Sequence, residues 1–323
     1  MNIIFMGTPD FAKESLQELV EAGYNVSLVI TNPDKQKGRG LKFVYSPVKE
    51  YALENGLEIE QPLKLKGNNE LIDKIKSKKP DLICVVAYGK IIPKEILDLP
   101  KIGCINVHGS LLPKYRGAAP IQWAVINGDK KTGITTMLIN EKMDEGDMLL
   151  KEEVEIGEDE TLGEVWDKLA KIGSKLLVET IRRIEKGRIR RIPQTSVGQE
   201  EPSYAPMLDK SIAKINWELN TAQEIKNLIR GLNPIMGAYT FINNKKIKIW
   251  KAQVIDEKDF IQQYNCPLEE LNKNNYGDVL IADSKKGLFL KAKNGIISIL
   301  EIQAENAKKM NILDYLRGNT ILS

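Results

Sequence analysis

Three polar residues near the ends of two apolar runs have the chemistry of a catalytic site. Asn106 and His108 stand two positions apart, and His108 is the only histidine among the 323 residues. Side chains two positions apart on a strand point to the same face, so we expect the amide and the imidazole to lie together. Asp144 follows a second apolar run, in the loop 139–147. An amide donor, a titratable imidazole and a carboxylate are suited to general acid–base catalysis.

A lone histidine is more often a structural side chain than a catalytic one, and spacing does not show that the three residues meet. The position of the pair along the chain favours catalysis. Gly109, Ser110 and Pro113 end the strand of His108 and begin a loop. Open α/β sheets bind their ligands at the carboxyl ends of the strands, which is where this pair would stand.

The surrounding elements predict an α/β fold. Apolar runs alternate with helical patterns over residues 1–190, which indicates a Rossmann-like, doubly wound and mostly parallel sheet. We expect strands at 3–6, 26–31, 57–60, 82–87 and 132–139, and a further strand that ends at residue 108. The turn at 7–10 has one glycine where a dinucleotide fingerprint has three, which argues against NAD binding.

A second domain is expected after a linker. Residues 191–208 are rich in proline, serine and glutamine, a composition typical of linkers. Residues 209–323 contain short alternating runs joined by turns such as Asn-Asn and Asn-Gly. This pattern predicts a small OB-like antiparallel β-barrel.

Composition and charge narrow the classes of protein to which the chain can belong. No apolar run reaches the ~20 residues of a membrane span, and the start of the chain lacks a signal-peptide pattern. We therefore expect a cytoplasmic protein without a membrane partner. Cys84, Cys104 and Cys266 have neither CxxC spacing nor partner histidines, so we expect reduced thiols and no metal site. A net charge of +3 with local basic clusters permits a nucleic-acid partner without requiring one.

Several stretches resemble the folate-dependent formyltransferases, and among them the methionyl-tRNA formyltransferases. Asn-Val-His-Gly-Ser-Leu-Leu-Pro (106–113), with Asp144 downstream, resembles the motif of folate-dependent formyl transfer. A methionyl-tRNA as the acceptor of the formyl group is indicated by three features. They are Pro-Asp-Lys-Gln-Lys-Gly-Arg-Gly (33–40), Gly-Ala-Ala-Pro-Ile-Gln (117–122) and the basic C-terminal domain. The resemblance implies transfer of a formyl group from 10-formyltetrahydrofolate to the α-amine of methionine on initiator methionyl-tRNA, for translation initiation.

The resemblance also implies roles for individual residues. Asn106 and a protonated His108 would bind the formyl oxygen as charge builds on it, while ionised Asp144 would keep the imidazole charged and accept the proton of the amine. For Leu111 and Leu112, core packing is an equally good explanation. The implied folate-binding residues are Val86, Tyr88, Gly89, Ser110, Leu111, Leu112, Pro113 and Ile139.

For the tRNA, the resemblance points to basic side chains in two places. Arg39 lies in the glycine-flanked loop, where a planar guanidinium can contact phosphates or base edges. A solvated charged surface explains each basic cluster equally well. The other expected tRNA-binding residues are Lys35, Lys37, Lys42, Lys246 and Lys248. We expect the protein to act as a monomer.

Three alternatives remain at this point. One is a folate-dependent formyltransferase that acts on an amino sugar or a purine precursor, against which the basic loop and C-terminal domain argue. The others are a hydrolase or dehydrogenase-fused folate enzyme and a non-enzymatic RNA-binding protein.

The chain departs from the family pattern at Asn306 and Ala307, where a glycine and a lysine are usual. Residues 256–276 look long and polar, and we expect a disordered surface insertion there rather than an added contact.

Overall fold

The computed structural model describes residues 1–37, 42–196 and 201–321, and they form two compact units. The first unit contains Met1–Pro120, Lys131–Glu155 and Trp166–Pro206. The second contains Ile121–Lys130, Ile156–Val165 and Met207–Ser323. Each unit is therefore built from separate stretches of sequence. The predicted boundaries, in contrast, assign residues 121–130 and 156–165 to the first domain.

The first unit is built on a seven-stranded sheet with the strand order β5-β2-β1-β6-β7-β8-β9. The five strands from β5 to β7 pair in parallel, whereas β7–β8 and β8–β9 are antiparallel. The prediction of a mostly parallel α/β sheet is confirmed. The strands are β1 (Asn2–Gly7), β2 (Asn25–Ile30), β5 (Ile59–Glu60), β6 (Leu82–Val86), β7 (Gly103–His108), β8 (Lys131–Leu138) and β9 (Met148–Glu155).

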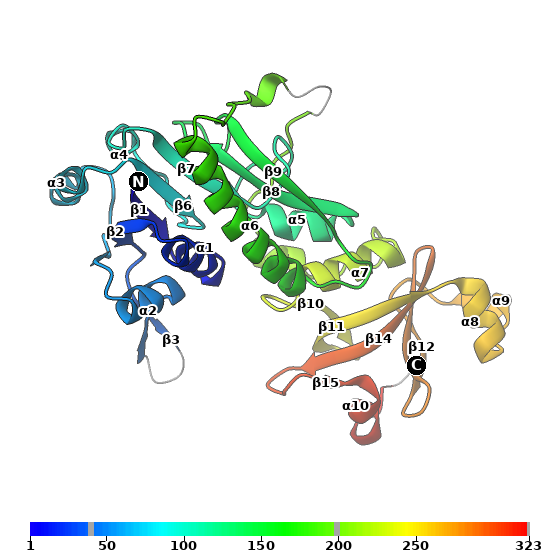
Figure 1. Cartoon of the computed structure of the whole chain (residues 1–323). Coiled ribbons are helices and arrows are strands. Elements are labelled where there is room, and N and C mark those ends of the chain that lie inside the picture. The colour runs from blue at the N-terminus through cyan, green and yellow to red at the C-terminus, as the bar shows by residue number, and fades with distance from the viewer. Residues whose placement is uncertain (38–41, 197–200, 322–323) are drawn as a thin grey trace. The chain divides into compact units, whose positions relative to one another are not determined.

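Helices cover both faces of this sheet, as a doubly wound fold requires (Figure 1). On one face, Leu71 and Ile75 of α3 pack in a cluster with Ile4, Met6 and alternating residues of the neighbouring strands. On the other face lie α1, which contacts β1, β2 and β6, and α6, which approaches β7 and β8 at Gly173. The helices are α1 (Asp10–Glu21), α2 (Pro47–Glu54), α3 (Asn69–Lys78), α4 (Lys94–Leu97) and α6 (Leu162–Glu185).

Local sequence explains where these elements begin. Ser46 accepts a hydrogen bond from the Lys49 amide at the start of α2, and Pro47 occupies the first helical position. At Thr161 a capping box forms, because Glu164 accepts from the Thr161 amide while Thr161 accepts from the Glu164 amide. All five residues of β6 are buried, as a continuous apolar run in a parallel sheet predicts.

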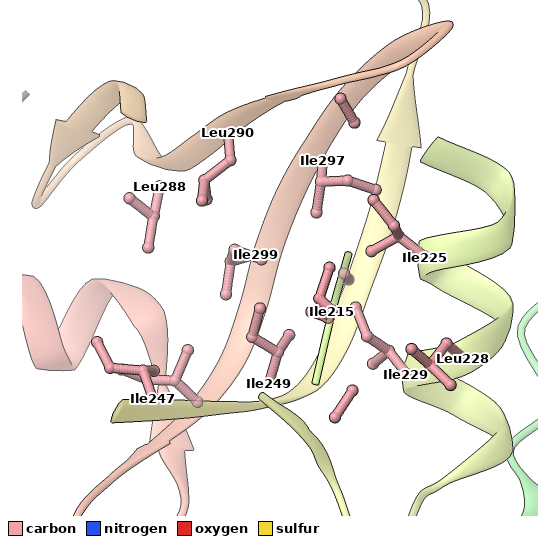
Figure 2. Close-up of a cluster of buried hydrophobic side chains, with 14 of the residues drawn as sticks. Ile215, Ile225, Leu228, Ile229, Ile247, Ile249, Leu288, Leu290, Ile297 and Ile299 are labelled. Atoms are coloured by element: carbon pink, nitrogen blue, oxygen red, sulfur yellow. The ribbon is translucent and has the colours of Figure 1, made fainter. Parts of the chain in front are cut away.

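The second unit has a six-stranded antiparallel sheet in the order β10-β11-β14-β13-β12, with β15 paired to β14. Isoleucines and leucines of its inner face pack against helix α7 (Figure 2), and this cluster is the core of the unit. Closure of the sheet into the predicted OB-like barrel stays a prediction. The strands are β10 (Ala238–Ile242), β11 (Lys245–Ile255), β12 (Val279–Asp283), β13 (Gly287–Ala292), β14 (Gly295–Ala304) and β15 (Met310–Asn311).

The remaining helices of this unit correct one prediction. Residues 256–276, expected to be disordered, form α8 (Glu257–Tyr264) and α9 (Leu268–Lys273). Phe260 and Leu271 pack with Phe289, so the polar composition of the stretch conceals two short amphipathic helices. The Lys291 ammonium donates to the carbonyls of Leu271 and Asn274, both at 2.8 Å. The other helices are α5 (Pro120–Ile126), η2 (Lys210–Ala213), α7 (Ala222–Gly231) and α10 (Ile312–Gly318).

Candidate active site

His108 is the last residue of β7, at the carboxyl end of the parallel part of the sheet. Its side chain is 5% exposed. The Nε2 atom lies 2.9 Å from the carbonyl oxygen of Tyr115. A carbonyl only accepts hydrogen bonds, so Nε2 carries the proton and donates it. The other ring nitrogen, Nδ1, faces Asp144.

Asp144 approaches this imidazole from the loop after β8. Its Oδ2 lies 3.8 Å from His108 Nδ1 and accepts a 2.8 Å hydrogen bond from the Gly117 amide. The residue has a left-handed backbone, with φ at +53°, which is uncommon outside glycine. Strained backbone of this kind persists where the surrounding structure fixes it. The structure thus places the histidine beside the aspartate, which the spacing of the sequence could not show.

Glycines allow the close approaches in this region. A Cβ on Gly146 would lie 1.7 Å from the Leu138 carbonyl oxygen, which no side chain tolerates. Gly117 has φ at +117°, and a Cβ there would lie 2.7 Å from the Ala205 carbonyl oxygen. Glycine therefore lets the Asp144 loop pack on the end of β8 at position 146 and lets the turn after His108 pack on Ala205 at position 117.

Asn106 stands on β7 two residues before His108, half-buried between β6 and β8. It pairs with Val85 on one side and Met137 on the other. Since side chains alternate along a strand, the amide and the imidazole share one face of the sheet. Whether Asn106 binds a formyl oxygen stays a prediction.

The loop after His108 is stabilised from within. Ser110 Oγ donates to the Lys114 carbonyl at 2.6 Å, so its hydroxyl has a partner inside the loop. Thr135 Oγ1 donates to the Ser110 carbonyl at 2.7 Å and accepts from the Leu112 amide at 3.1 Å. Leu112 is fully buried with Met137 and Met148, while Leu111 is half-buried. The peptide bond between Leu112 and Pro113 is cis.

The other predicted folate-binding residues lie at or just after the ends of β6 and β8. Val86 and Tyr88 are buried, and Ile139 packs against the cluster that contains Tyr88. Burial raises the pKa of Tyr88 to about 12. The Tyr88 carbonyl accepts a 2.7 Å hydrogen bond from Asn32, and Gly89 follows with φ at +77°. These residues lie at the strand ends beside the site, and their contact with folate is untested.

The predicted tRNA-binding residues lie in two places. Arg39 falls outside the described residues. Lys35 and Lys37 lie on β3 (Lys35–Lys37) and Lys42 on β4 (Lys42–Val44), a short antiparallel hairpin. In the second unit, Lys246 Nζ lies 3.9 Å from the centre of the Tyr239 ring, and Lys248 donates to the Met236 carbonyl at 2.9 Å. Binding of RNA by these lysines stays a prediction.

Three residues of the site were missed by sequence reasoning. Gln194 is buried; it accepts from Arg116 and donates to the Asp144 carbonyl. Ser203 accepts from the Tyr115 amide at 2.9 Å. Both belong to the stretch predicted as a linker, whose composition gives no sign of these contacts. Arg116 lies in the conspicuous stretch Lys-Tyr-Arg-Gly (114–117), which was the one available signal.

Two features are absent from the described residues. Within them, no group of three or more His, Cys, Asp or Glu side chains is arranged to hold a metal ion. The helices in the described ranges include none that is long and apolar enough to cross a membrane. Cys84 and Cys104 are free and buried, as predicted, and burial raises the pKa of Cys104 to about 12.

Comparison with known proteins covers nearly the whole chain. Residues 1–181 match the family described as "Formyl transferase", and residues 207–320 match "Formyl transferase, C-terminal domain". A methionyl-tRNA formyltransferase from Ruminiclostridium cellulolyticum is 47% identical, with 99% of this chain and 97% of the relative covered. One from Caldanaerobacter subterraneus is 48% identical, with coverages of 99% and 98%.

Solved structures share the fold at low sequence identity. HypX from Aquifex aeolicus, in complex with tetrahydrofolic acid, aligns with a TM-score of 0.63 and 15% identity over 97% of this chain and 46% of that one. An N-formyltransferase from Helicobacter canadensis, in complex with folinic acid and dTDP-3-aminofucose, gives a TM-score of 0.63 and 20% identity, with 92% and 98% covered. At these identities the likeness concerns the fold alone.

Proposed function

The chain belongs to the formyl transferase family, and from this membership we propose that it formylates the α-amino group of methionine on initiator methionyl-tRNA, with 10-formyltetrahydrofolate as donor. The observation that carries the proposal is identity of 47% over 321 residues to a methionyl-tRNA formyltransferase, across both family domains. The reaction serves translation initiation.

The geometry of His108 and Asp144 supports the roles proposed for them. When the amine attacks, a C–N bond forms to the formyl carbon and negative charge builds on the formyl oxygen. Asn106 and His108, protonated at Nδ1, stabilise that charge; one such donor is worth ~10²–10³ in turnover. The bond from the formyl carbon to the folate nitrogen then breaks. The proton lost by the amine passes by way of Asp144 to the leaving nitrogen, so no covalent enzyme intermediate is needed.

We propose that folate binds along the strand ends beside this pair. Main-chain groups of Val86, Tyr88, Gly89 and Ile139 would form hydrogen bonds with the pterin, which explains why their side chains are mostly apolar. Ser110 and Leu112 would contribute through the shape of the loop, because their side chains have partners within the protein. Leu111 and Pro113 would border the folate.

The tRNA would contact both family domains. We propose that Arg39, with Lys35, Lys37 and Lys42, contacts the acceptor end, and that residues 209–323 close into an OB-like barrel whose Lys246 and Lys248 lie near the phosphates. In this proposal residues 1–190 carry the catalysis and 191–208 join the two parts. The enzyme would act as a monomer in the cytoplasm without a membrane partner.

The deciding experiment is formyl transfer from 10-formyltetrahydrofolate to charged initiator tRNA. Uncharged tRNA and a nucleotide-linked amino sugar serve as controls, the latter because a structural neighbour was solved with dTDP-3-aminofucose. We expect transfer to the charged tRNA alone. Transfer to the sugar alone would retain the catalytic residues and overturn the acceptor, and no transfer to any of the three would refute the proposal.

A further inference from the structure

The turn at residues 115–117 contacts both members of the proposed catalytic pair. The Tyr115 carbonyl accepts from His108 Nε2 at 2.9 Å, and the Gly117 amide donates to Asp144 Oδ2 at 2.8 Å. Tyr115 and Gly117 both have positive φ, at +60° and +117°. A turn with this backbone keeps its shape only where neighbouring structure fixes it. Contacts that hold the 115–117 turn in place therefore also hold His108 and Asp144 in place.

The first fixing contact comes from residues 203–205. Ser203 Oγ accepts from the Tyr115 amide at 2.9 Å, and the Ser203 carbonyl accepts from the Arg116 amide at 2.8 Å. The Ala205 amide donates to the Arg116 carbonyl at 2.7 Å. Three polar groups of the turn's backbone thus bind a segment that begins 88 positions further along the chain.

The second contact is the side chain of Gln194, which is 6% exposed. Its Oε1 accepts from Arg116 Nε and Nη2 at 2.9 and 2.7 Å. Its Nε2 donates to the carbonyls of Asp144 and Gly146 at 2.7 and 3.0 Å. Both amide protons and the amide oxygen are therefore used. One buried side chain ties the turn to the loop that carries Asp144.

We propose that Gln194 and Ser203 are positioning residues: they fix the 115–117 turn and the Asp144 loop so that His108 and Asp144 face each other. The inference rests on the proposed function in taking those two residues as the catalytic pair. The hydrogen bond to Tyr115 holds the Nε2–H tautomer and leaves Nδ1 toward Asp144. If the turn shifts, the Nδ1–H tautomer competes and the pair loses its alignment. A misplacement of about 1 Å can cost ~10²-fold in rate.

The single histidine makes a direct test possible, because every imidazole signal of the protein comes from residue 108. Gln194→Ala and Ser203→Ala are compared with the wild-type full chain by ¹⁵N imidazole NMR at a pH where the ring is neutral, and by kcat at saturating substrates. We expect mixed tautomer signals and a loss of about 10- to 100-fold in kcat. Ser203→Thr, which keeps the hydroxyl, should restore both readouts.

Ser196→Ala is the matched control. Ser196 lies two residues after Gln194 and is exposed. Its hydroxyl donates to the Pro193 carbonyl at 2.6 Å and not to the 115–117 turn. It should behave as wild type. Wild-type tautomer signals and kcat in both Gln194→Ala and Ser203→Ala would overturn the proposal, even if their melting temperatures fell.

The outcomes also separate this inference from the proposed function. If the wild-type protein transfers no formyl group, the proposed function fails, while the imidazole spectra still decide whether the two residues position His108. Should Ser203→Ala not fold, Gln194→Met, which keeps the side-chain length and removes all four hydrogen bonds, is judged by the same two readouts.

Discussion

The candidate active site and the core of the second unit are held together by different forces. Around His108, polar atoms form hydrogen bonds, several of them between residues far apart in sequence, and the backbone includes positions with positive φ. The core of the second unit consists of apolar side chains on alternating positions of antiparallel strands, packed against α7 (Figure 2). Apolar packing is non-directional, whereas hydrogen bonds demand geometry. Substitutions in the two regions should therefore have opposite effects on stability and turnover.

The largest effect on stability is expected from Ile299→Ala in β14. Ile299 is 1% exposed within the core of the second unit. Removing three carbons from a buried isoleucine costs about 2–5 kcal/mol through lost transfer energy and the cavity left behind. Urea unfolding measures the loss. Turnover per folded molecule should change little, and Ile235→Ala, at a position 65% exposed, is the control. An equal loss in both variants would contradict the packing argument.

Substitutions in the catalytic pair should have the opposite pattern, a large loss of turnover with a smaller loss of stability. His108→Ala and Asp144→Ala should each lower kcat by about 10²–10³-fold, because each removes charge stabilisation made in the transition state. Urea unfolding should show a smaller loss of stability than Ile299→Ala. Steady-state formyl transfer to charged initiator tRNA measures the effect. Near-normal turnover in either variant would remove that residue from the catalytic assignment.

The same contrast explains what the sequence could predict. The alternation of apolar runs and helices predicts the sheet of the first unit, and polar residues two positions apart at a strand end predict the Asn106–His108 pair. Strand β9 was not predicted, because half of its residues are exposed and charged. Gln194 and Ser203 could not be found either, since their partners lie 48 or more positions away and no local pattern marks such contacts.

An intermediate effect is expected where the second unit uses a buried charge. Lys291 is 8% exposed, and its ammonium binds the carbonyls of Leu271 and Asn274 at the end of α9. Lys291→Met keeps the length of the side chain and removes both hydrogen bonds, at a cost of about 1–3 kcal/mol. Hydrogen exchange should show faster opening of 268–276 and unchanged protection of β14. Exposed Lys293→Met is the control, and unchanged exchange in 268–276 would show that α9 does not depend on this lysine.

The smallest effect concerns an ion pair at the edge of the first unit. Glu58 lies 2.8 Å from the Lys74 ammonium and also pairs with Lys78, and these hydrogen bonds lower its pKa from 4.5 to about 2. A carboxyl whose pKa is lower in the folded state stabilises the fold above pH 4.5, and that contribution is lost as the pH falls toward 2. The Glu58 side chain is 44% exposed, so screening limits the contribution to roughly 0.2–1 kcal/mol. Urea unfolding of Glu58→Gln should differ from wild type at pH 6, and the difference should shrink as the pH falls toward 2. Glu70→Gln on α3 controls for the loss of one carboxylate. A difference that stayed constant across this range would mean that the ion pair contributes nothing to stability, since only an ionised Glu58 can pair with the lysines.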